Sequence, residues 1–360
     1  MAASFVIAGR NNGFAKADAR AAAMASVTAY QEAMADFARM STMGIWYAHF
    51  DEDRFKTLIQ DALLAEISTG VKRDKNAKAA KDKHKNPKQA KVMKEAARRA
   101  EKSLAKAHTR DSVQALSKLG ELVEGKYRIV SQPPVIVPAR DLAATFGLSP
   151  DQIIPMLHDQ FRAYRATLPD DRRKLLEKFE IVDAARKVVG VGSVGTRAFI
   201  VLLEGRDSHD PLFLQIKEAT ASVLEASLPR SRYRRHGERV VQGQRMMQAS
   251  SDIFLGWSKG VDVNRHFYWR QLRDMKGSAL VELMAPVTLM YYGQMCGWTL
   301  ARAHARSGDP VAMAGYLGRD DAFGRSVIDF CERYADRNEQ DYEEFVKAIR
   351  SGRLQAVEGV

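Results

Sequence analysis

Three glycines and one lysine form the clearest chemical pattern in the sequence. Gly190, Gly192 and Gly195 have the spacing G-x-G-x-x-G, and Lys217 lies near the end of the following segment PLFLQIKEA. Glycines lack a Cβ, so backbone N–H groups can approach phosphate oxygens closely, and a lysine ammonium adds a positive charge. The pattern indicates a phosphate-binding turn. A plain β-hairpin with a glycine-rich turn and a solvated lysine is an equally good interpretation of these residues.

The residues after the glycines indicate which kind of phosphate-binding site is compatible with the sequence. A dinucleotide-binding loop opens a helix, but here residues 198–203 read AFIVLL, which favours a buried strand. The chain also lacks the P-loop pattern G-x-x-x-x-G-K-[ST]. Strand, glycine turn, strand, loop and lysine-bearing strand is the order of a kinase nucleotide lobe. In the lysine strand, alternation separates Leu212, Leu214 and Ile216 from Lys217, which is expected to face a ligand cleft.

A lysine that binds phosphate in a cleft is commonly held by a carboxylate from a following helix. Glu225 and Glu238 are the two candidates, and they rank almost equally, because most glutamates on such a helix are simply solvated. The later segments DIFLGW and RHFYWRQLRDMKGSA predict two further strands. The sequence thus predicts a five-stranded sheet that holds one helix and ends in a hinge near residues 271–276.

The remaining segments are predominantly helical. Residues 1–70 carry Met24, Val27, Tyr30, Met34 and Phe37 at helical spacing, residues 148–190 predict two amphipathic helices leading into the first glycine, and long helices follow the hinge. We therefore predict an α+β protein, mostly helical, with one small antiparallel sheet lobe. The expected parts are a helical half at 1–180, a nucleotide-binding-like sheet lobe at 181–278, and a helical end at 279–360 that packs with the first half.

The net charge of +12 is concentrated in one arm. Residues 72–110 contain 15 Lys and Arg against 4 Asp and Glu, and Pro87 divides the arm into two predicted helices that form a hairpin. The functional interpretation is a surface for polyanions such as nucleic acid, an acidic protein or anionic lipid. A solvated helical hairpin is the favoured alternative, because the arm contains no aromatic residue except two histidines.

The composition predicts a soluble protein of the cytoplasm. The 360 residues are 46% hydrophobic and 28% charged, with no apolar run of membrane-spanning length and no basic leader before the first apolar stretch. Cys296 and Cys331 fit neither zinc-ligand nor redox spacing, so no metal site is expected from them. The sequence offers no prediction of the oligomeric state.

Several blocks together closely resemble a bacterial family called domain of unknown function 2252. The resemblance is carried by VVGVGSVGTRAFIVLLEGRDSHDPLFLQIKEA, HGERVVQGQRMMQASSDIFLGW, FYWRQLRDMKGSA and CGWTLARAHARSGD, and it extends along essentially the whole chain. It implies a fold similar to protein kinases and aminoglycoside phosphotransferases, with the lobes in permuted order. It also implies ATP as ligand, with Gly190, Gly192, Ser193 and Gly195 over the phosphates and Lys217 as their ammonium.

The resemblance also implies that the metal-binding part of such a site lies elsewhere. In this family G-D-x-H-x-x-N-F-G and D-F-D-E motifs precede the helical half, and neither motif occurs in these residues. His304 and Asp309 in AHARSGD have no metal-binding partners in the sequence and are interpreted as the end of a helix. We expect Mg²⁺ binding only where the upstream motifs are present, and no catalytic residue is assigned. The expectation is either a fragment of a phosphotransferase, which is favoured, or a short member that binds a nucleotide or partner without turnover.

Overall fold

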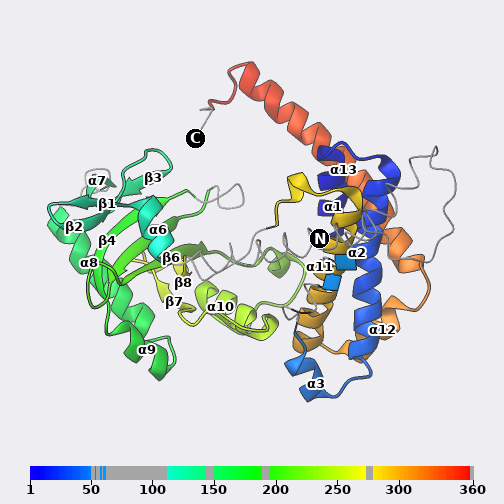
Figure 1. The fold of residues 1–360 in the computed structure, drawn as a ribbon, viewed down its shortest axis with the longest axis horizontal. Coiled ribbons are helices and arrows are strands. Elements are labelled where there is room, and N and C mark those ends of the chain that lie inside the picture. The colour runs from blue at the N-terminus through cyan, green and yellow to red at the C-terminus, as the bar shows by residue number, and fades with distance from the viewer. Residues whose placement is uncertain are drawn as a thin grey trace, which may run out of the picture. The chain divides into compact units, whose positions relative to one another are not determined.

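The computed structural model describes residues 1–49, 53, 57–58, 60–61, 112–142, 150–188, 195–272 and 279–356, with the side chains of residues 150–154 excepted. These residues fall into two compact units. The helical unit contains the described residues up to 61 and from 279, and the sheet unit contains residues 112–272. Figure 1 shows the elements of each unit.

The helical unit is built around two long helices, α2 and α11, with the other helices packed against them. The two run in the same direction, because Ala22 lies beside Gly293, Ser26 beside Gly297 and Tyr30 beside His304. Its elements are α1 (Ala2–Asn11), α2 (Lys16–Phe37), α3 (Thr42–Tyr47), the 3-10 turn η4 (Val281–Leu283), α11 (Pro286–Ser307), α12 (Pro310–Leu317) and α13 (Ala322–Arg350). Two glycines of α11 allow the close approach of α2. A Cβ on Gly297 would lie 2.1 Å from the carbonyl oxygen of Ser26, and one on Gly293 would lie 2.8 Å from that of Ala22.

Apolar side chains spaced three or four residues apart along these helices form the core of the helical unit. Val27, Met34 and Phe37 of α2 are buried, which confirms the predicted helical stripe at these positions. Val27 packs in one cluster with Ile328 and Cys331 of α13, whereas Met34 and Phe37 pack in a second cluster with Ala301 of α11. The burial of one face of each helix is therefore what holds the unit together.

The sheet unit contains a two-stranded and a six-stranded antiparallel sheet. The first pairs β1 (Gly120–Val123) with β2 (Lys126–Ile129). The second has the order β3-β4-β5-β6-β8-β7, made of β3 (Ile136–Pro138), β4 (Glu180–Lys187), β5 (Ala198–Glu204), β6 (Pro211–Ala219), β7 (Gly256–Lys259) and β8 (His266–Gln271). The helical elements are α6 (Ser112–Leu119), α7 (Ala139–Leu142), α8 (Pro150–Arg165), α9 (Asp170–Leu176), the 3-10 turn η3 (Val223–Ala226) and α10 (His236–Met247).

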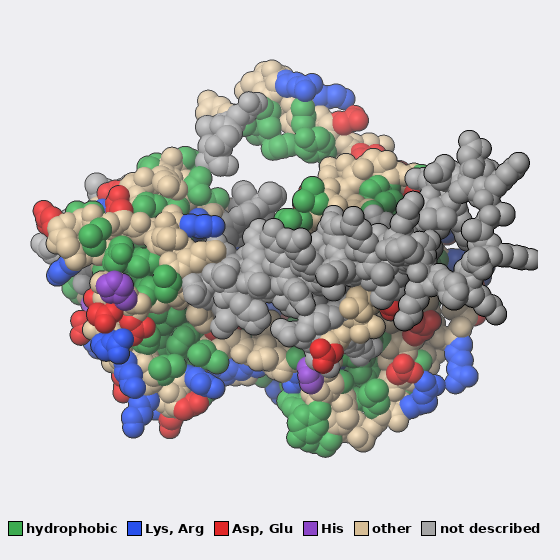
Figure 2. Space-filling view, in the orientation of Figure 1, with side chains coloured by type: hydrophobic (Ala, Val, Ile, Leu, Met, Phe, Trp, Pro, Cys, Tyr) green, Lys and Arg blue, Asp and Glu red, His purple; other side chains and the backbone are tan. Residues whose placement is uncertain are grey.

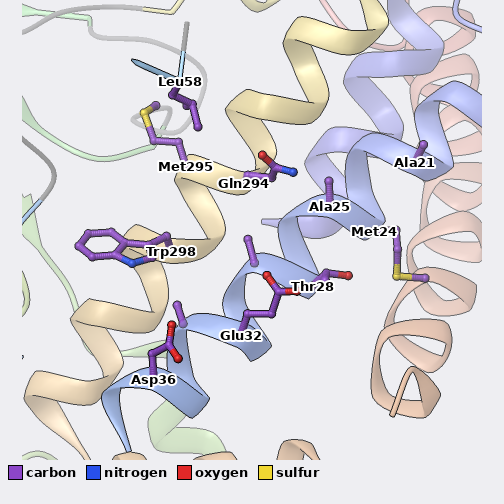
Figure 3. Close-up of a pocket in the computed structure, with 12 residues that line it drawn as sticks. Ala21, Met24, Ala25, Thr28, Glu32, Asp36, Leu58, Gln294, Met295 and Trp298 are labelled. Atoms are coloured by element: carbon purple, nitrogen blue, oxygen red, sulfur yellow. The ribbon is translucent and has the colours of Figure 1, made fainter. Parts of the chain in front are cut away.

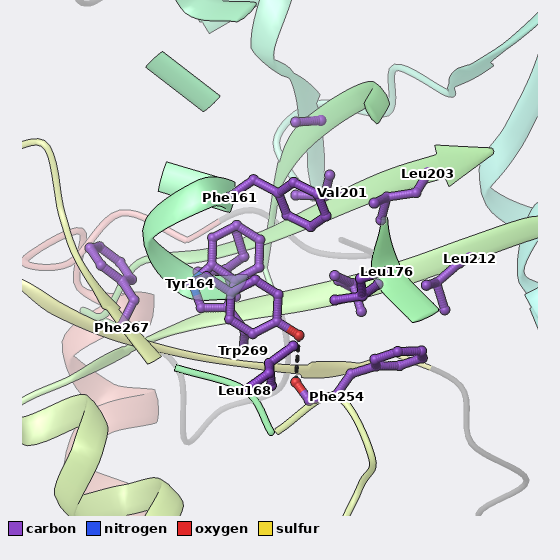
Figure 4. Close-up of a cluster of buried hydrophobic side chains, with 13 residues drawn as sticks. Phe161, Tyr164, Leu168, Leu176, Val201, Leu203, Leu212, Phe254, Phe267 and Trp269 are labelled. Atoms are coloured by element: carbon purple, nitrogen blue, oxygen red, sulfur yellow. Dashed lines mark hydrogen bonds between the residues drawn. The ribbon is translucent and has the colours of Figure 1, made fainter. Parts of the chain in front are cut away.

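One face of the six-stranded sheet is apolar and is covered by α8 and α9. Leu212, Leu214 and Ile216 of β6 lie on it, together with Tyr164 of α8 and Trp269 of β8. Figure 4 shows this cluster, in which the Tyr164 and Trp269 rings stack with centroids 4.4 Å apart and the Tyr164 hydroxyl donates a 2.6 Å hydrogen bond to the carbonyl of Phe254. Because strand side chains alternate, the same pattern sends the odd-numbered residues of β6 to the opposite face.

Helices of the described part of the chain cover the opposite face only in part. At one end, Ala115 and Leu116 of α6 pack with Phe213, Ile200 and Leu202. Elsewhere α10 packs on β7 and β8, where Gly237 lies so close to the sheet that a Cβ would be 2.3 Å from the carbonyl oxygen of Phe267. Gln215 and Lys217 lie on this face beyond Phe213, because they follow it at intervals of two.

The structure confirms the α+β class and the mostly helical composition, and it adds one strand to the expected sheet. Residues 180–187 form strand β4, which confirms the strand expected before the glycine turn, and this strand pairs with β3 on one side and with β5 on the other. The sheet has six strands where five were expected, because β3 adds to its edge. Helices α8 and α9, grouped with the helical half in the sequence analysis, pack on the sheet.

Candidate functional site

The glycine turn joins β4 to β5, and the structure describes its last glycine. Gly195 has a φ of 82°, a left-handed conformation that favours glycine, and a Cβ placed there would meet no atom of the described residues within 4 Å. Because glycine has no side chain, the backbone at this point presents no Cβ to an approaching ligand. Gly190, Gly192 and Ser193 lie outside the described residues.

The structure places Lys217 close to that turn in the sheet. Its register partner on β5 is Ala198, three residues after Gly195, and its partner on β8 is Tyr268. The Cα atoms of directly paired residues in antiparallel strands lie about 4.5–5.5 Å apart. The Cα atom of Lys217 therefore lies beside the first residue of β5. The predicted order of strand, glycine turn, strand and lysine strand thus has a defined geometry.

Lys217 is half-buried and has no counter-ion among the described residues. Burial, followed by the neighbouring charge of Arg270, lowers the pKa of Lys217 from its ordinary value of 10.5. A cation that is partly desolvated beside another cation favours an anionic ligand, because the ligand would replace the lost solvation and neutralise the repulsion. This combination is the electrostatic signature of the candidate site.

Neither predicted carboxylate forms an ion pair with Lys217 within the described residues. Glu225 lies in η3, and Glu238 lies in the first turn of α10, where its charge is favourable at the positive end of the helix dipole. The glutamate that does form ion pairs nearby is Glu218, which contacts Arg265 at 2.8 Å and Arg197 at 3.6 Å. Glu218 follows Lys217 directly and therefore points to the other face of the sheet.

The segment with His304 and Asp309 has a structural role, as the sequence suggested. His304 belongs to the last turn of α11, and its Nδ1 atom is 2.8 Å from the hydroxyl of Tyr30. The Asp309 carboxylate caps α12 by accepting hydrogen bonds from the backbone N–H groups of Val311 and Ala312. Among the described residues, no group of three or more His, Cys, Asp or Glu side chains is arranged to hold a metal ion.

The helical unit contains a cavity of about 620 Å³ beside the α2–α11 pair. Figure 3 shows Thr28, Glu32 and Asp36 on α2 and Trp298 and Met295 on α11 along its wall. The described residues that line it include no Lys, Arg or His. Its two carboxylates would repel phosphates, so the cavity does not suit the nucleotide phosphates that Lys217 suits.

The sequence analysis did not identify Tyr268 and Arg270, two side chains that strand pairing brings next to Lys217. Arg270 of β8 pairs in register with Gln215 of β6, and both lie on the same face as Lys217 and Tyr268. Alternation in HFYWRQ places Tyr268 and Arg270 on one face, but only the β6–β8 pairing shows that this face is the one with Lys217.

Charge elsewhere on the described surface is mixed. Figure 2 shows positive and negative side chains interspersed on the visible face of the sheet unit. On α9, for example, Arg173 is 2.5 Å from Asp170, and Arg172 is 3.4 Å from Asp171. The predicted Lys-rich hairpin at 72–110 lies outside the described residues. None of the helices that the structure describes has the length and apolar character needed to cross a bilayer.

Comparisons with known proteins identify the family. Neither the curated proteins nor the solved structures contain a significant match to the chain. A model of a protein family matches residues 1–102 and 72–348, and its description is an uncharacterized protein conserved in bacteria (DUF2252). Because the matched residues cover most of the sequence and include the glycine turn, Lys217 and Arg270, the chain belongs to the DUF2252 family.

Proposed function

We propose that the chain is an ATP-binding protein with a kinase-like nucleotide lobe, a member of a phosphotransferase-type family. The polar face of the sheet would receive the phosphates, with the glycine turn above them and Lys217 as their ammonium. The observation that supports this most strongly is a half-buried lysine, without a carboxylate partner among the described residues, in strand register with the residues that follow the glycine turn.

The order of the elements also supports the proposal. A glycine turn joins two antiparallel strands, the lysine strand is next in the sheet, helix α10 follows, and two more strands complete the sheet. A kinase nucleotide lobe uses the same sequence of elements, with its lysine directed at the phosphates. Helix α10 packs on β6, β7 and β8, which supports the proposal that it is the helix bordering the ligand.

Binding, rather than turnover, is the activity that we propose for these residues. Phosphoryl transfer depends on carboxylates that hold Mg²⁺ between the phosphates. The D-x-H-x-x-N and D-F-D motifs that would supply them are not in this sequence. We propose that Mg²⁺-dependent transfer, to an acceptor that the residues do not define, requires those motifs in addition.

Thermal unfolding with and without ATP tests the proposal on the full chain. A ligand at 100 times its Kd stabilises the folded state by about 2.7 kcal/mol, so ATP should raise the Tm of the wild type clearly. Lys217→Ala should abolish that rise, whereas Lys174→Ala on the distant helix α9 should keep it. If ATP leaves the wild-type Tm unchanged, or if Lys217→Ala retains the full rise, the proposed function is wrong.

A second candidate function rests on the concentration of charge in residues 72–110, with 15 Lys and Arg against 4 Asp and Glu. These residues would bind polyanions in a salt-dependent manner, and the protein would then act as a scaffold or binding protein. The same variants separate the two functions. Polyanion binding that is lost on deletion of 72–110 but unaffected by Lys217→Ala would favour the second.

A further inference from the structure

Four polar side chains form a compact group on the partly covered face of the six-stranded sheet. Lys217 is in register with Tyr268, and Gln215 is in register with Arg270, so the four occupy two adjacent cross-strand pairs of β6 and β8. We call Gln215, Lys217, Tyr268 and Arg270 the polar quartet. Lys217 and Arg270 are diagonal neighbours in it, a relation that puts backbone positions about 7–8 Å apart and within reach of long side chains.

The polar quartet holds its arginine in a fixed orientation. The Gln215 side chain is 2% exposed, and its Oε1 atom accepts hydrogen bonds from Nε of Arg270 at 3.1 Å and from Nη2 at 2.9 Å. These two bonds use one edge of the guanidinium. The Nη1 group and the remaining Nη2 hydrogen keep their capacity to donate, because a guanidinium carries five N–H donors. Gln215 thus positions Arg270 for a second partner.

The quartet is rich in donors and lacks a negative charge. Lys217 and Arg270 form no ion pair with any described carboxylate, and the Tyr268 hydroxyl forms no hydrogen bond within the described residues. All three side chains are half-buried. Burial lowers the pKa of Lys217 and raises that of Tyr268, so in the neutral pH range the tyrosine remains a neutral donor beside two cations.

On the other face of the same strand, a charged side chain forms ion pairs with neighbouring side chains. Glu218, the next residue, accepts hydrogen bonds from the backbone N–H of Arg197 at 3.0 Å and from Arg265 at 2.8 Å. Each charged side chain in that group, Glu218, Arg197 and Arg265, has a neighbour of opposite charge. Two desolvated cations side by side without such a neighbour are unfavourable unless a ligand supplies the negative charge.

We propose that the polar quartet is a two-cation site for a chain of phosphates, in which Lys217 and Arg270 contact different phosphate groups and Gln215 positions Arg270. This inference rests on the proposed function, because it takes the face with Lys217 as the ligand-binding face. It adds a second phosphate-binding residue, and it assigns the recognition to the phosphate chain. Nucleoside di- and triphosphates, and inorganic triphosphate alone, should bind far better than monophosphates.

Isothermal titration with inorganic triphosphate, ATP, AMP and orthophosphate tests this. In the wild type, triphosphate and ATP should bind at least tenfold more tightly than orthophosphate and AMP. Arg270→Gln should weaken both ligands by a factor of 10 or more and should reduce the dependence of their Kd on salt, because one phosphate contact is lost. Arg206→Gln, which changes an exposed arginine in the β5–β6 loop, should leave both affinities unchanged.

The outcomes separate this inference from the proposed function. If Lys217→Ala abolishes ATP binding but Arg270→Gln binds ATP normally, the two-cation site is wrong and the proposed function stands. If ATP and triphosphate bind equally and both need Lys217 and Arg270, the inference is supported. If triphosphate binds through both residues while ATP does not bind, the anion site stands and the nucleotide function fails.

Folding of the variants does not decide the result. Arg270→Lys keeps the charge but loses the two-bond contact with Gln215, so it should fold and bind triphosphate with an affinity between those of wild type and Arg270→Gln. The ligand selectivity of the wild type needs no variant at all. Wild-type protein that binds triphosphate no better than orthophosphate overturns the inference.

Discussion

The two faces of the six-stranded sheet use adjacent residues for opposite purposes. On one face Leu212, Leu214 and Ile216 of β6 are buried under α8 and α9 with Tyr164 and Trp269. On the other face Gln215 and Lys217 meet Tyr268 and Arg270, where two cations have no carboxylate partner in the described residues. The apolar face supplies stability, whereas on the polar face two cations without a carboxylate partner among the described residues cost stability unless the proposed anion binds.

The largest expected effect is on the apolar face. Trp269 is 1% exposed, stacks on Tyr164 and donates a 2.9 Å hydrogen bond from Nε1 to the Ser258 hydroxyl. Trp269→Ala should lower the free energy of unfolding by about 3–5 kcal/mol, because it leaves a cavity in the core and an unpaired hydroxyl. Urea denaturation monitored by circular dichroism measures this. Tyr268→Phe, on the opposite face of the same strand, should cost less than about 1 kcal/mol; similar losses for the two variants would contradict the division between the faces.

Part of this division is predictable from sequence. Alternation in PLFLQIKEA separates the leucines from Lys217, and the glycine spacing identifies a turn whose last member, Gly195, has positive φ. These are local properties, set by the period of a strand and by the conformational freedom of glycine. The contact between Arg270 and Gln215 was not predicted, because it depends on the pairing of β6 with β8, which are separated by more than 40 residues. Pairing across that distance is decided by burial of the whole unit.

The same reasoning explains why the sequence did not predict the strand at the edge of the sheet. Strand β3 has only three residues, too few for alternation to identify a strand, and it joins the sheet by pairing with β4, EIVDAARK. Asp183 in β4 is 4% exposed, and its carboxylate accepts hydrogen bonds from the backbone N–H of Ile129 and from Arg140. A buried carboxylate inside a strand is understandable only when those partners are known.

A medium effect is expected at the end of β8, where His266 receives a hydrogen bond from the N-terminus of α10. Its Nδ1 atom accepts from the backbone N–H of His236 at 3.2 Å, so the ring must be neutral there. Burial and then the charges of His236, Lys259 and Arg235 lower the pKa of His266 below its ordinary 6.5. The unfolded chain therefore binds more protons between that lowered value and 6.5, and stability should fall as the pH falls through this window.

Thermal unfolding between pH 8 and pH 5 measures this dependence. His266→Gln retains a side-chain acceptor but does not titrate. The drop in Tm between pH 8 and pH 5 should therefore be smaller in this variant than in the wild type, by roughly 1–3 °C. His209→Gln provides the control, because His209 is exposed in the β5–β6 loop. Equal pH dependence in the wild type and His266→Gln would show that the end of α10 does not depend on this contact.

The smallest expected effect has the opposite sign and lies in the polar quartet. Because burial and Arg270 lower the pKa of Lys217, its charge is unfavourable in the folded state at neutral pH, and the cost disappears as the pH rises through the lowered pKa toward 10.5. Lys217→Met keeps the apolar stem and removes the charge, so it should raise the Tm of the ligand-free protein by roughly 1–2 °C. Differential scanning calorimetry at pH 7 checks this. A lower Tm would mean that the charge has a partner that stabilises it.

The contact between α2 and α11 has a consequence for how the helical unit tolerates change. At Gly297 the partner atom is a main-chain oxygen, that of Ser26, so no choice of neighbouring side chain can make room for a methyl group. The spacing of the two axes is fixed by backbone touching backbone. Substitutions at other positions can adjust the shape of this interface. At position 297, however, we expect evolution to retain glycine.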